Sequence, residues 1–177
     1  SPVRLEPELS WSAPSWAHPL GCGEGGVDLL ALVAHASLRA VLLAVCVALV
    51  GFVIGCPLGA AAAVARGRLE RAVARACDLV QAFPTFLLAL VVLSAVRSPS
   101  RLDLGFVFAL TAWAPFARLA LAQTRVLRDQ AFVEAARAIG VTPARVVVRH
   151  LVPNLLGIVA VQLGAAAAAV VVSEAAL

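Results

Sequence analysis

The feature that most constrains the fold is a run of 26 uncharged residues between Arg39 and Arg66. It is longer than the roughly 20 residues that an α-helix needs to cross the hydrocarbon core of a bilayer. Hydrophobic residues make up 62% of the 177-residue chain, which is more than a soluble domain of this length buries in its core. The run therefore predicts a transmembrane helix, and the composition extends that environment to most of the chain.

Three further apolar runs follow the first. Segment 79–96 has no charged residue and is 18 residues long. Segment 104–117 has 14 residues and spans a bilayer only if the helix continues through Arg118 to about Thr124. The last run extends over 151–173. We therefore predict an all-α fold, a polytopic bundle of about four transmembrane helices.

The placement of the arginines predicts the orientation of these helices. All fourteen basic residues are arginine, and ten of them lie in 66–78 or in 118–149. Four spans bring these two segments to the same side of the membrane. Because cytoplasmic loops carry the excess of positive charge, segment 125–153 is expected in the cytoplasm and segment 1–36 outside. The transmembrane domain is then expected to occupy 37–177.

Two sets of residues have two interpretations each. Trp11 and Trp16 either sit at the level of the lipid headgroups or pack inside a loop. Pro57, Pro84 and Pro115 fall in or near spans and either kink a helix or mark its first turn.

A polar, basic segment between the third and fourth runs is predicted to form two short helices, 130–139 and 143–151. Asp129 is a suitable N-cap, and Gly140 suits the left-handed position at which a helix ends. The pair Thr142–Pro143 supplies a cap and a first-turn proline for the second helix. The two helices are therefore expected to turn sharply at Gly140.

The first of these helices carries an apolar face. Four residues share it at helical spacing: Phe132, Ala135, Ala136 and Ile139. Helices of about ten residues are marginal alone, so this pair must pack on something. One hypothesis is a groove in a partner protein, which the small alanines would approach closely. The other is a layer of lipid headgroups, with arginines at the phosphates.

Two further features are candidates for packing or transport. Gly51, Gly55 and Gly59 recur every four residues and form a flat stripe that permits close helix contact, although glycine is also common in membrane helices. Glu174 lies near the end of the fourth run, where a carboxylate is either an interfacial residue or part of a transport pathway.

No motif indicates an enzyme. The chain contains no lysine, so it cannot form the Gly-x4-Gly-Lys loop that holds the phosphates of ATP, and any ATP must bind to a partner. No catalytic residue, cofactor-binding residue or metal ligand is predicted. The charges flank apolar spans and do not form an aromatic-studded basic face, so nucleic acid is not an expected partner.

The cytoplasmic segment resembles the Glu-Ala-Ala loop of ABC-importer permeases at Glu134, Ala135, Ala136, Gly140, Leu151 and Pro153. Leu151 and Pro153 favour the docking hypothesis over the lipid one. Further matches in order along the chain are similar to the dipeptide/oligopeptide/nickel branch of these permeases: His18–Gly21, Gln81–Leu90, Trp113–Leu119, Phe132–Gly140, Arg149–Asn154 and Ser173–Leu177.

The resemblance implies a six-helix subunit of a bacterial inner-membrane importer of di- or oligopeptides, with the first and last helices of that plan lying outside this chain. It implies a second permease subunit, two cytoplasmic ATPases that bind ATP and Mg²⁺, an external substrate-binding protein and surrounding membrane lipid. The ATPase-coupling role is carried over to Glu134, Ala135, Ala136 and Gly140 only. The alternative is a membrane scaffold or assembly protein whose cytoplasmic helices bind lipid or another partner.

Overall fold

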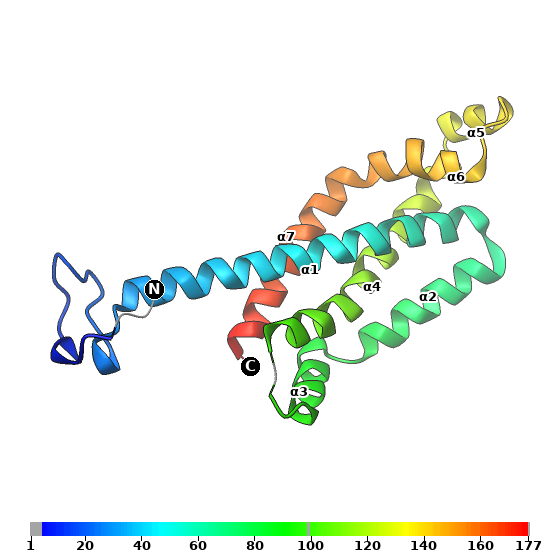
Figure 1. Cartoon of the computed structure of the whole chain (residues 1–177). Coiled ribbons are helices and arrows are strands. Elements are labelled where there is room, and N and C mark those ends of the chain that lie inside the picture. Colours follow the sequence, from blue (N-terminus) through cyan, green and yellow to red (C-terminus); the bar gives the residue numbers. More distant parts are fainter. Residues whose placement is uncertain (1–4, 99, 177) are drawn as a thin grey trace. The chain divides into compact units, whose positions relative to one another are not determined.

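The computed structural model describes residues 5–98 and 100–176, and these are helical over most of their length (Figure 1). The only β pairing among them is an isolated bridge between Cys22 and Asp28, so the all-α prediction is confirmed. The helices, in chain order, are η1 (Pro7–Leu9), η2 (Glu24–Gly26), α1 (Leu29–Ala65), α2 (Gly67–Ala82), α3 (Thr85–Ala95), α4 (Arg101–Leu127), α5 (Ala131–Ala138), α6 (Pro143–Val146), the π-helical segment η3 (Val147–Leu151) and α7 (Val152–Ala176).

The chain forms two compact units, which divide between Leu42 and Leu43. The N-terminal unit is a short loop structure that leads into α1. Gly26 has φ +73°, and a Cβ atom there would lie 1.7 Å from the backbone oxygen of Glu6, so only glycine fits. Trp11 is 76% exposed and Trp16 is fully exposed. The interpretation of these tryptophans as packed loop aromatics is therefore wrong.

Asp28 stabilises the start of α1. One carboxylate oxygen accepts hydrogen bonds from the backbone N–H groups of Leu30 (2.8 Å) and Ala31 (3.2 Å), and the other lies 3.0 Å from Nδ1 of His18. These bonds, the one from His18 first, hold the pKa of the Asp28 carboxyl below its ordinary value of 3.8. The ionised carboxylate thus ties the His18 loop to the helix N-terminus.

The lowered pKa of Asp28 predicts an acid-sensitive loop. A carboxyl group whose folded-state pKa is depressed contributes stability above its unfolded value of about 3.8, and this stability is lost as the pH falls through the folded value. Protection of the Leu30 and Ala31 amides from hydrogen exchange should fall in that acid range. Asp28→Asn should remove the pH dependence of this protection, whereas Glu8→Gln should keep it. A pH profile that is the same in Asp28→Asn and in the original chain would contradict the prediction.

Three helices are long and apolar enough to cross a membrane: Leu29–Ala65, Leu102–Leu127 and Pro143–Ala176. They correspond to the first, third and fourth predicted runs. As expected, α4 continues without interruption past Arg118. Pro57 and Pro115 lie inside α1 and α4, and neither ends its helix.

The second predicted span is not a single helix. The helix is interrupted at Phe83–Pro84, and the axes of α2 and α3 are bent by 69° at this point (Figure 1). A proline disfavours helical geometry in the residue before it, and Phe83 is accordingly extended at φ −93° and ψ 125°. With 11 residues, α3 is about 16 Å long and too short to cross a bilayer alone. The run 79–96 therefore spans the end of α2 and all of α3, and Pro84 is the N-cap residue immediately before the first turn of α3.

The glycine stripe of α1 lies directly against the backbone of α4. A Cβ atom would meet the carbonyl oxygen of Ala112 at 2.7 Å from Gly51, that of Trp113 at 2.2 Å from Gly55 and that of Ala117 at 2.1 Å from Gly59. Every one of these positions is too close for a side chain. The absence of Cβ atoms lets the two helix backbones touch, as small residues do in membrane helix pairs.

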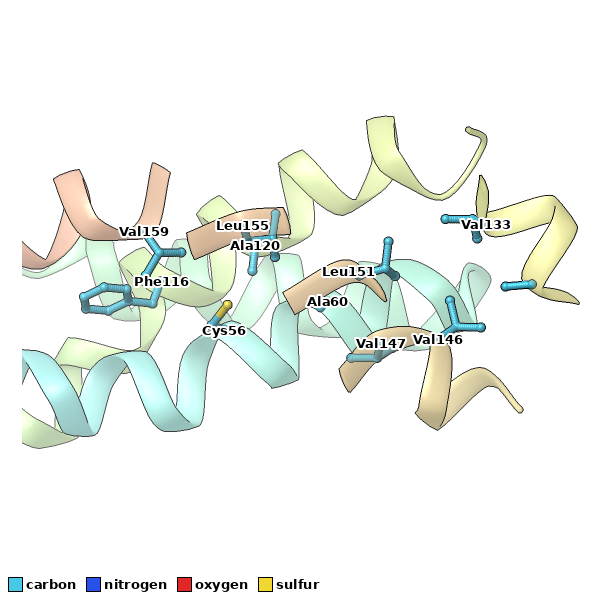
Figure 2. Packing of buried hydrophobic residues seen from close by; sticks show 11 residues of the cluster. Cys56, Ala60, Phe116, Ala120, Val133, Val146, Val147, Leu151, Leu155 and Val159 are labelled. Atoms are coloured by element: carbon cyan, nitrogen blue, oxygen red, sulfur yellow. The ribbon is translucent and has the colours of Figure 1, made fainter. Parts of the chain in front are cut away.

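A buried cluster connects the helices at the α5 end of the larger unit. Its members come from α1 (Cys56, Ala60), α4 (Phe116, Ala120), α5 (Val133, Ala136), α6 and η3 (Val146, Val147, Leu151) and α7 (Leu155, Val159). Figure 2 shows ten of these side chains, labelled, pointing into the common space between the helices. Helices far apart in sequence are thus packed as one body beneath the α5–α6 loop.

Candidate functional site

The polar segment after α4 forms the predicted pair of helical elements with a turn at Gly140. Gly140 has φ +80°, and the N–H of Val141 donates to the carbonyl of Ala136 at 3.1 Å. This hydrogen bond to the carbonyl five residues earlier is typical of the Schellman motif, and it satisfies a carbonyl at the end of the helix. Thr142 and Pro143 occupy the N-cap and first position of α6 as predicted, although the Thr142 side chain makes no capping hydrogen bond.

The predicted N-cap of the first helix is wrong. α5 begins at Ala131, and the carbonyl of Gln130 accepts from the N–H groups of Val133 and Glu134. Asp129 is instead engaged elsewhere, because its carboxylate lies 2.6 Å from the guanidinium of Arg66.

Burial divides α5 into two faces. Val133 is fully buried and Ala136 is 5% exposed, and both belong to the cluster shared with α1, α4 and α7 (Figure 2 labels Val133). Phe132, Ala135 and Ile139 are exposed, Ile139 to 82%. The expected apolar face is thus open except for Ala136. Ala136 lies three residues after Val133, so it turns inward with it.

The other two residues assigned to coupling are on the outside. Glu134 is exposed, and no ion pair or side-chain hydrogen bond to it occurs within the described residues. Gly140 is exposed, with no atom within 4 Å of where a Cβ would stand. Glycine is favoured there by the left-handed backbone alone.

The segment after the turn runs straight into the last membrane helix. Residues 143–176 form one helical path, with π-helical geometry over Val147–Leu151. Pro153 has no N–H and its ring crowds the carbonyl of Arg149, which accounts for the wider turn at this point. The Asn154 side chain donates to the carbonyl of His150 at 2.6 Å. The predicted boundary at residue 151 is therefore a change of helical geometry within a continuous helix.

A cluster of charged residues holds the end of α4 to the α1–α2 turn, immediately before α5. Glu70 on α2 accepts from Nε of Arg125 at 2.5 Å, and its other oxygen lies 3.4 Å from Nη1 of Arg128. The same Arg128 guanidinium donates to the carbonyl of Ala63 near the end of α1. Glu70 is 12% exposed and Arg128 16%, so these charges are largely shielded from water.

The turn between α1 and α2 is itself unusual. Arg66 combines φ +58° with ψ −177°, a conformation that few residues other than glycine adopt, and the following Gly67 has φ +64°. A positive φ is costly for a residue with a side chain. The Arg66–Asp129 bond holds this turn against the start of the α5 loop.

Sequence reasoning used these arginines only as markers of membrane side and missed the cluster. A signal was present, because Glu70 is the one acidic residue between Arg66 and Arg75. Its partners, however, lie 55 and 58 residues away along the chain.

Glu174 lies near the end of α7, at the opposite end of that helix from the α5–α6 loop. One of its carboxylate oxygens is enclosed without a hydrogen-bond partner among the described residues. The neighbouring Ser173 lines a small cavity of about 120 Å³ together with Thr85, Thr111 and apolar residues of α1, α4 and α7.

Comparison with known proteins places the chain among transport proteins. Residues 55–177 match the family model described as "Binding-protein-dependent transport system inner membrane component". The oligopeptide transport system permease protein OppC of Mycobacterium tuberculosis is 30% identical over 164 residues, which cover 91% of this chain and 56% of that protein.

Two other relatives have related names. A putative peptide transport system permease protein of Brucella suis is 32% identical over 170 residues, covering 96% of this chain and 56% of that protein. The glutathione transport system permease protein GsiD of Pectobacterium atrosepticum is 31% identical over 141 residues, covering 80% and 46%. The chain thus spans about half the length of the curated relatives that it matches. With the matched region covering the end of α1 and all of α2 to α7, the chain belongs to the family of inner-membrane components of binding-protein-dependent transport systems.

Proposed function

We propose that this chain is a transmembrane permease subunit of an ATP-driven importer of di- or oligopeptides, and that α5 couples it to a partner ATPase. The observation that carries the coupling role is the division of α5 into a buried face, held by the cluster, and an open apolar face. The names of the relatives support peptides as the substrate class.

The packing of α5 suits the transmission of movement. Val133 and Ala136 contact a cluster built from α1, α4, η3 and α7, so a push on α5 displaces these helices together. Packed interfaces move as bodies and do not deform continuously. Phe132, Ala135 and Ile139 form the surface on which the ATPase docks, and Glu134 lies beside it for a polar contact.

The proposed assembly contains a second permease subunit, two cytoplasmic ATPases that hold ATP and Mg²⁺, and an external substrate-binding protein. Segment 125–153 faces the cytoplasm of a bacterial cell and the N-terminal unit faces outward, as the arginine distribution indicates. Closure of the ATPases moves α5, and the membrane helices alternate between outward and inward access. Glu174 and the cavity beside Ser173 belong to the pathway.

Removing the open face of α5 tests the proposal. Ile139→Ser and Glu134→Ala should each weaken binding of a peptide-importer ATPase by about tenfold, since a well-packed apolar or charged contact contributes on the order of 1.4 kcal/mol. Uptake of labelled peptide should fall in parallel. Co-purification and uptake are measured on the transporter assembled in membranes.

Val126→Ser is the matched control, because Val126 is 63% exposed near the end of α4 and lies outside the proposed docking face. Unchanged ATPase binding and uptake in both α5 variants would show that the coupling assignment is wrong. Tight binding of anionic vesicles by segment 125–153, with no ATPase co-purifying, would favour the scaffold alternative.

A further inference from the structure

One face of α2 carries three arginines, Arg68, Arg71 and Arg75, that are exposed. No acidic side chain among the described residues pairs with them. Their spacing places them within about 60° of one another around the helix. The opposite face of α2 packs against α4, where Val73 and Cys77 are buried.

Among the arginines of α2, the α1–α2 turn and the second half of α4, only these three, here called the arginine stripe, lack an acidic partner within the described residues. The other arginines near it, Arg66, Arg118, Arg125 and Arg128, all lie beside a carboxylate. Both acidic residues of α2 are paired in this way: Glu70 with Arg125 and Arg128 at the end of α4, and Asp78 with Arg118. The stripe is therefore a surface with three positive charges and no internal counterion.

The same face changes character along the helix. Beyond Arg75 it continues with Leu79, 68% exposed, and then Phe83, 65% exposed, at the break before α3. At 1.5 Å per residue, the first of these apolar side chains lies about 6 Å past the last arginine. The surface is thus cationic over two turns and apolar over the next.

We propose that this face of α2, from Arg68 to Phe83, binds an anionic phospholipid. The guanidinium groups hold the phosphate, for which their planar donor geometry is suited, and the acyl chains lie along Leu79 and Phe83. The order of charged and then apolar residues fits a phospholipid, because its anionic headgroup is directly joined to its hydrocarbon tails. The distance of about 6 Å along the helix from Arg75 to Leu79 suits that arrangement. An acidic soluble protein would match the arginines and leave the apolar half exposed. Because the chain has helices long and apolar enough to cross a membrane, phospholipid surrounds the protein.

Photo-crosslinking on the full chain tests the proposal. The chain is purified in detergent and mixed with a photoreactive phosphatidylglycerol or with the matching phosphatidylcholine, and adducts are mapped by mass spectrometry. Phosphatidylglycerol should label residues 68–83 several-fold more than phosphatidylcholine, and the preference should decline with salt. The double variant Arg71→Gln/Arg75→Gln should bring the ratio of phosphatidylglycerol to phosphatidylcholine labelling close to one, since each arginine near an anionic surface contributes about fivefold to lipid binding.

The control is Arg145→Gln/Arg149→Gln, which removes the same charge from exposed positions in the α6–η3 segment and should keep the α2 adduct. Equal loss in both double variants would mean that net charge alone attracts the lipid, and it would overturn the proposal. Adducts of the original chain that fall outside 68–83, or equal labelling by both lipids, would also overturn it. Arg71→Lys/Arg75→Lys keeps the charge and should retain most of the preference even where the glutamine variant folds poorly.

Discussion

Replacing Gly59 by valine is expected to force α1 and α4 apart and to destabilise the larger unit by about 3 kcal/mol or more. A Cβ atom at this position would lie 2.1 Å from the carbonyl oxygen of Ala117, with two further backbone atoms of the same residue at 2.8 and 3.0 Å. Overpacking against a side chain is relieved by a change of rotamer, whereas a backbone atom moves only with its helix. The whole α1–α4 contact must therefore shift.

Gly164→Val is the matched control for Gly59→Val. Gly164 is also a helical glycine, in α7, but no atom lies within 4 Å of its Cβ position. Both exchanges replace a helical glycine by valine, so their difference isolates the packing effect. Thermal unfolding in detergent, followed by circular dichroism, should place Gly59→Val about 6–12 °C below Gly164→Val. Gly51→Ala, where the nearest atom is at 2.7 Å, should lie between them. Equal midpoints for the two valine variants would refute the close contact.

Charge-free runs predicted three of the membrane helices, because a long apolar segment has few other stable environments. The same argument failed at residues 79–96, because the length of a charge-free run reports hydrophobicity and says nothing about a change in the direction of the helix axis. From the sequence, Pro84 has two interpretations, a kink or a first turn, and the structure shows a 69° bend between α2 and α3 there. How sharply two helices diverge at such a break depends on packing, which no local pattern contains.

In the α5–α6 loop, local backbone chemistry was predictable and burial was not. The left-handed turn at Gly140 and the start of α6 at Pro143 follow from the conformational limits of glycine and proline. Ala135 and Ala136 look equivalent in sequence, yet only Ala136 is buried. The apolar face that the spacing predicts is mostly exposed, so the cluster from α1, α4 and α7 decides which side of this eight-residue helix turns inward.

The charged cluster shows a third limit. Asp129 was predicted as a helix cap from its local position, but it pairs with Arg66, 63 residues away. Such pairs become visible only once the topology places the α1–α2 turn beside the end of α4. Positive charge near a membrane is normally interpreted as a topology signal, and here the same arginines also join helices.

Loss of the Glu70 carboxylate should be the most damaging single change among the charged residues that the structure describes. Glu70→Gln leaves Arg125 and Arg128 facing a neutral amide, with Glu70 12% and Arg128 16% exposed, while Arg125 is 47% exposed. A hydrogen bond to a charged group contributes about 1.5–3 kcal/mol, and two are weakened together, so a loss of about 2–3 kcal/mol is expected. Because this cluster holds the end of α4 beside the α1–α2 turn, the α5 loop should also become more mobile in hydrogen exchange.

Asp78→Asn provides the comparison on the same pair of helices. Asp78 also pairs across to α4, with Arg118, but the two side chains are 57% and 51% exposed. Exposed pairs contribute at most about 1 kcal/mol, so this variant should unfold within a few degrees of the original chain. The double variant Glu70→Gln/Arg125→Gln should be less destabilised than the sum of its single changes, since removing both partners leaves one fewer unpaired charge. Additive effects would contradict the prediction. A loss of unfolding free energy in Asp78→Asn as large as that in Glu70→Gln would show that the low exposure of Glu70 and Arg128 does not make the Glu70 cluster more stabilising.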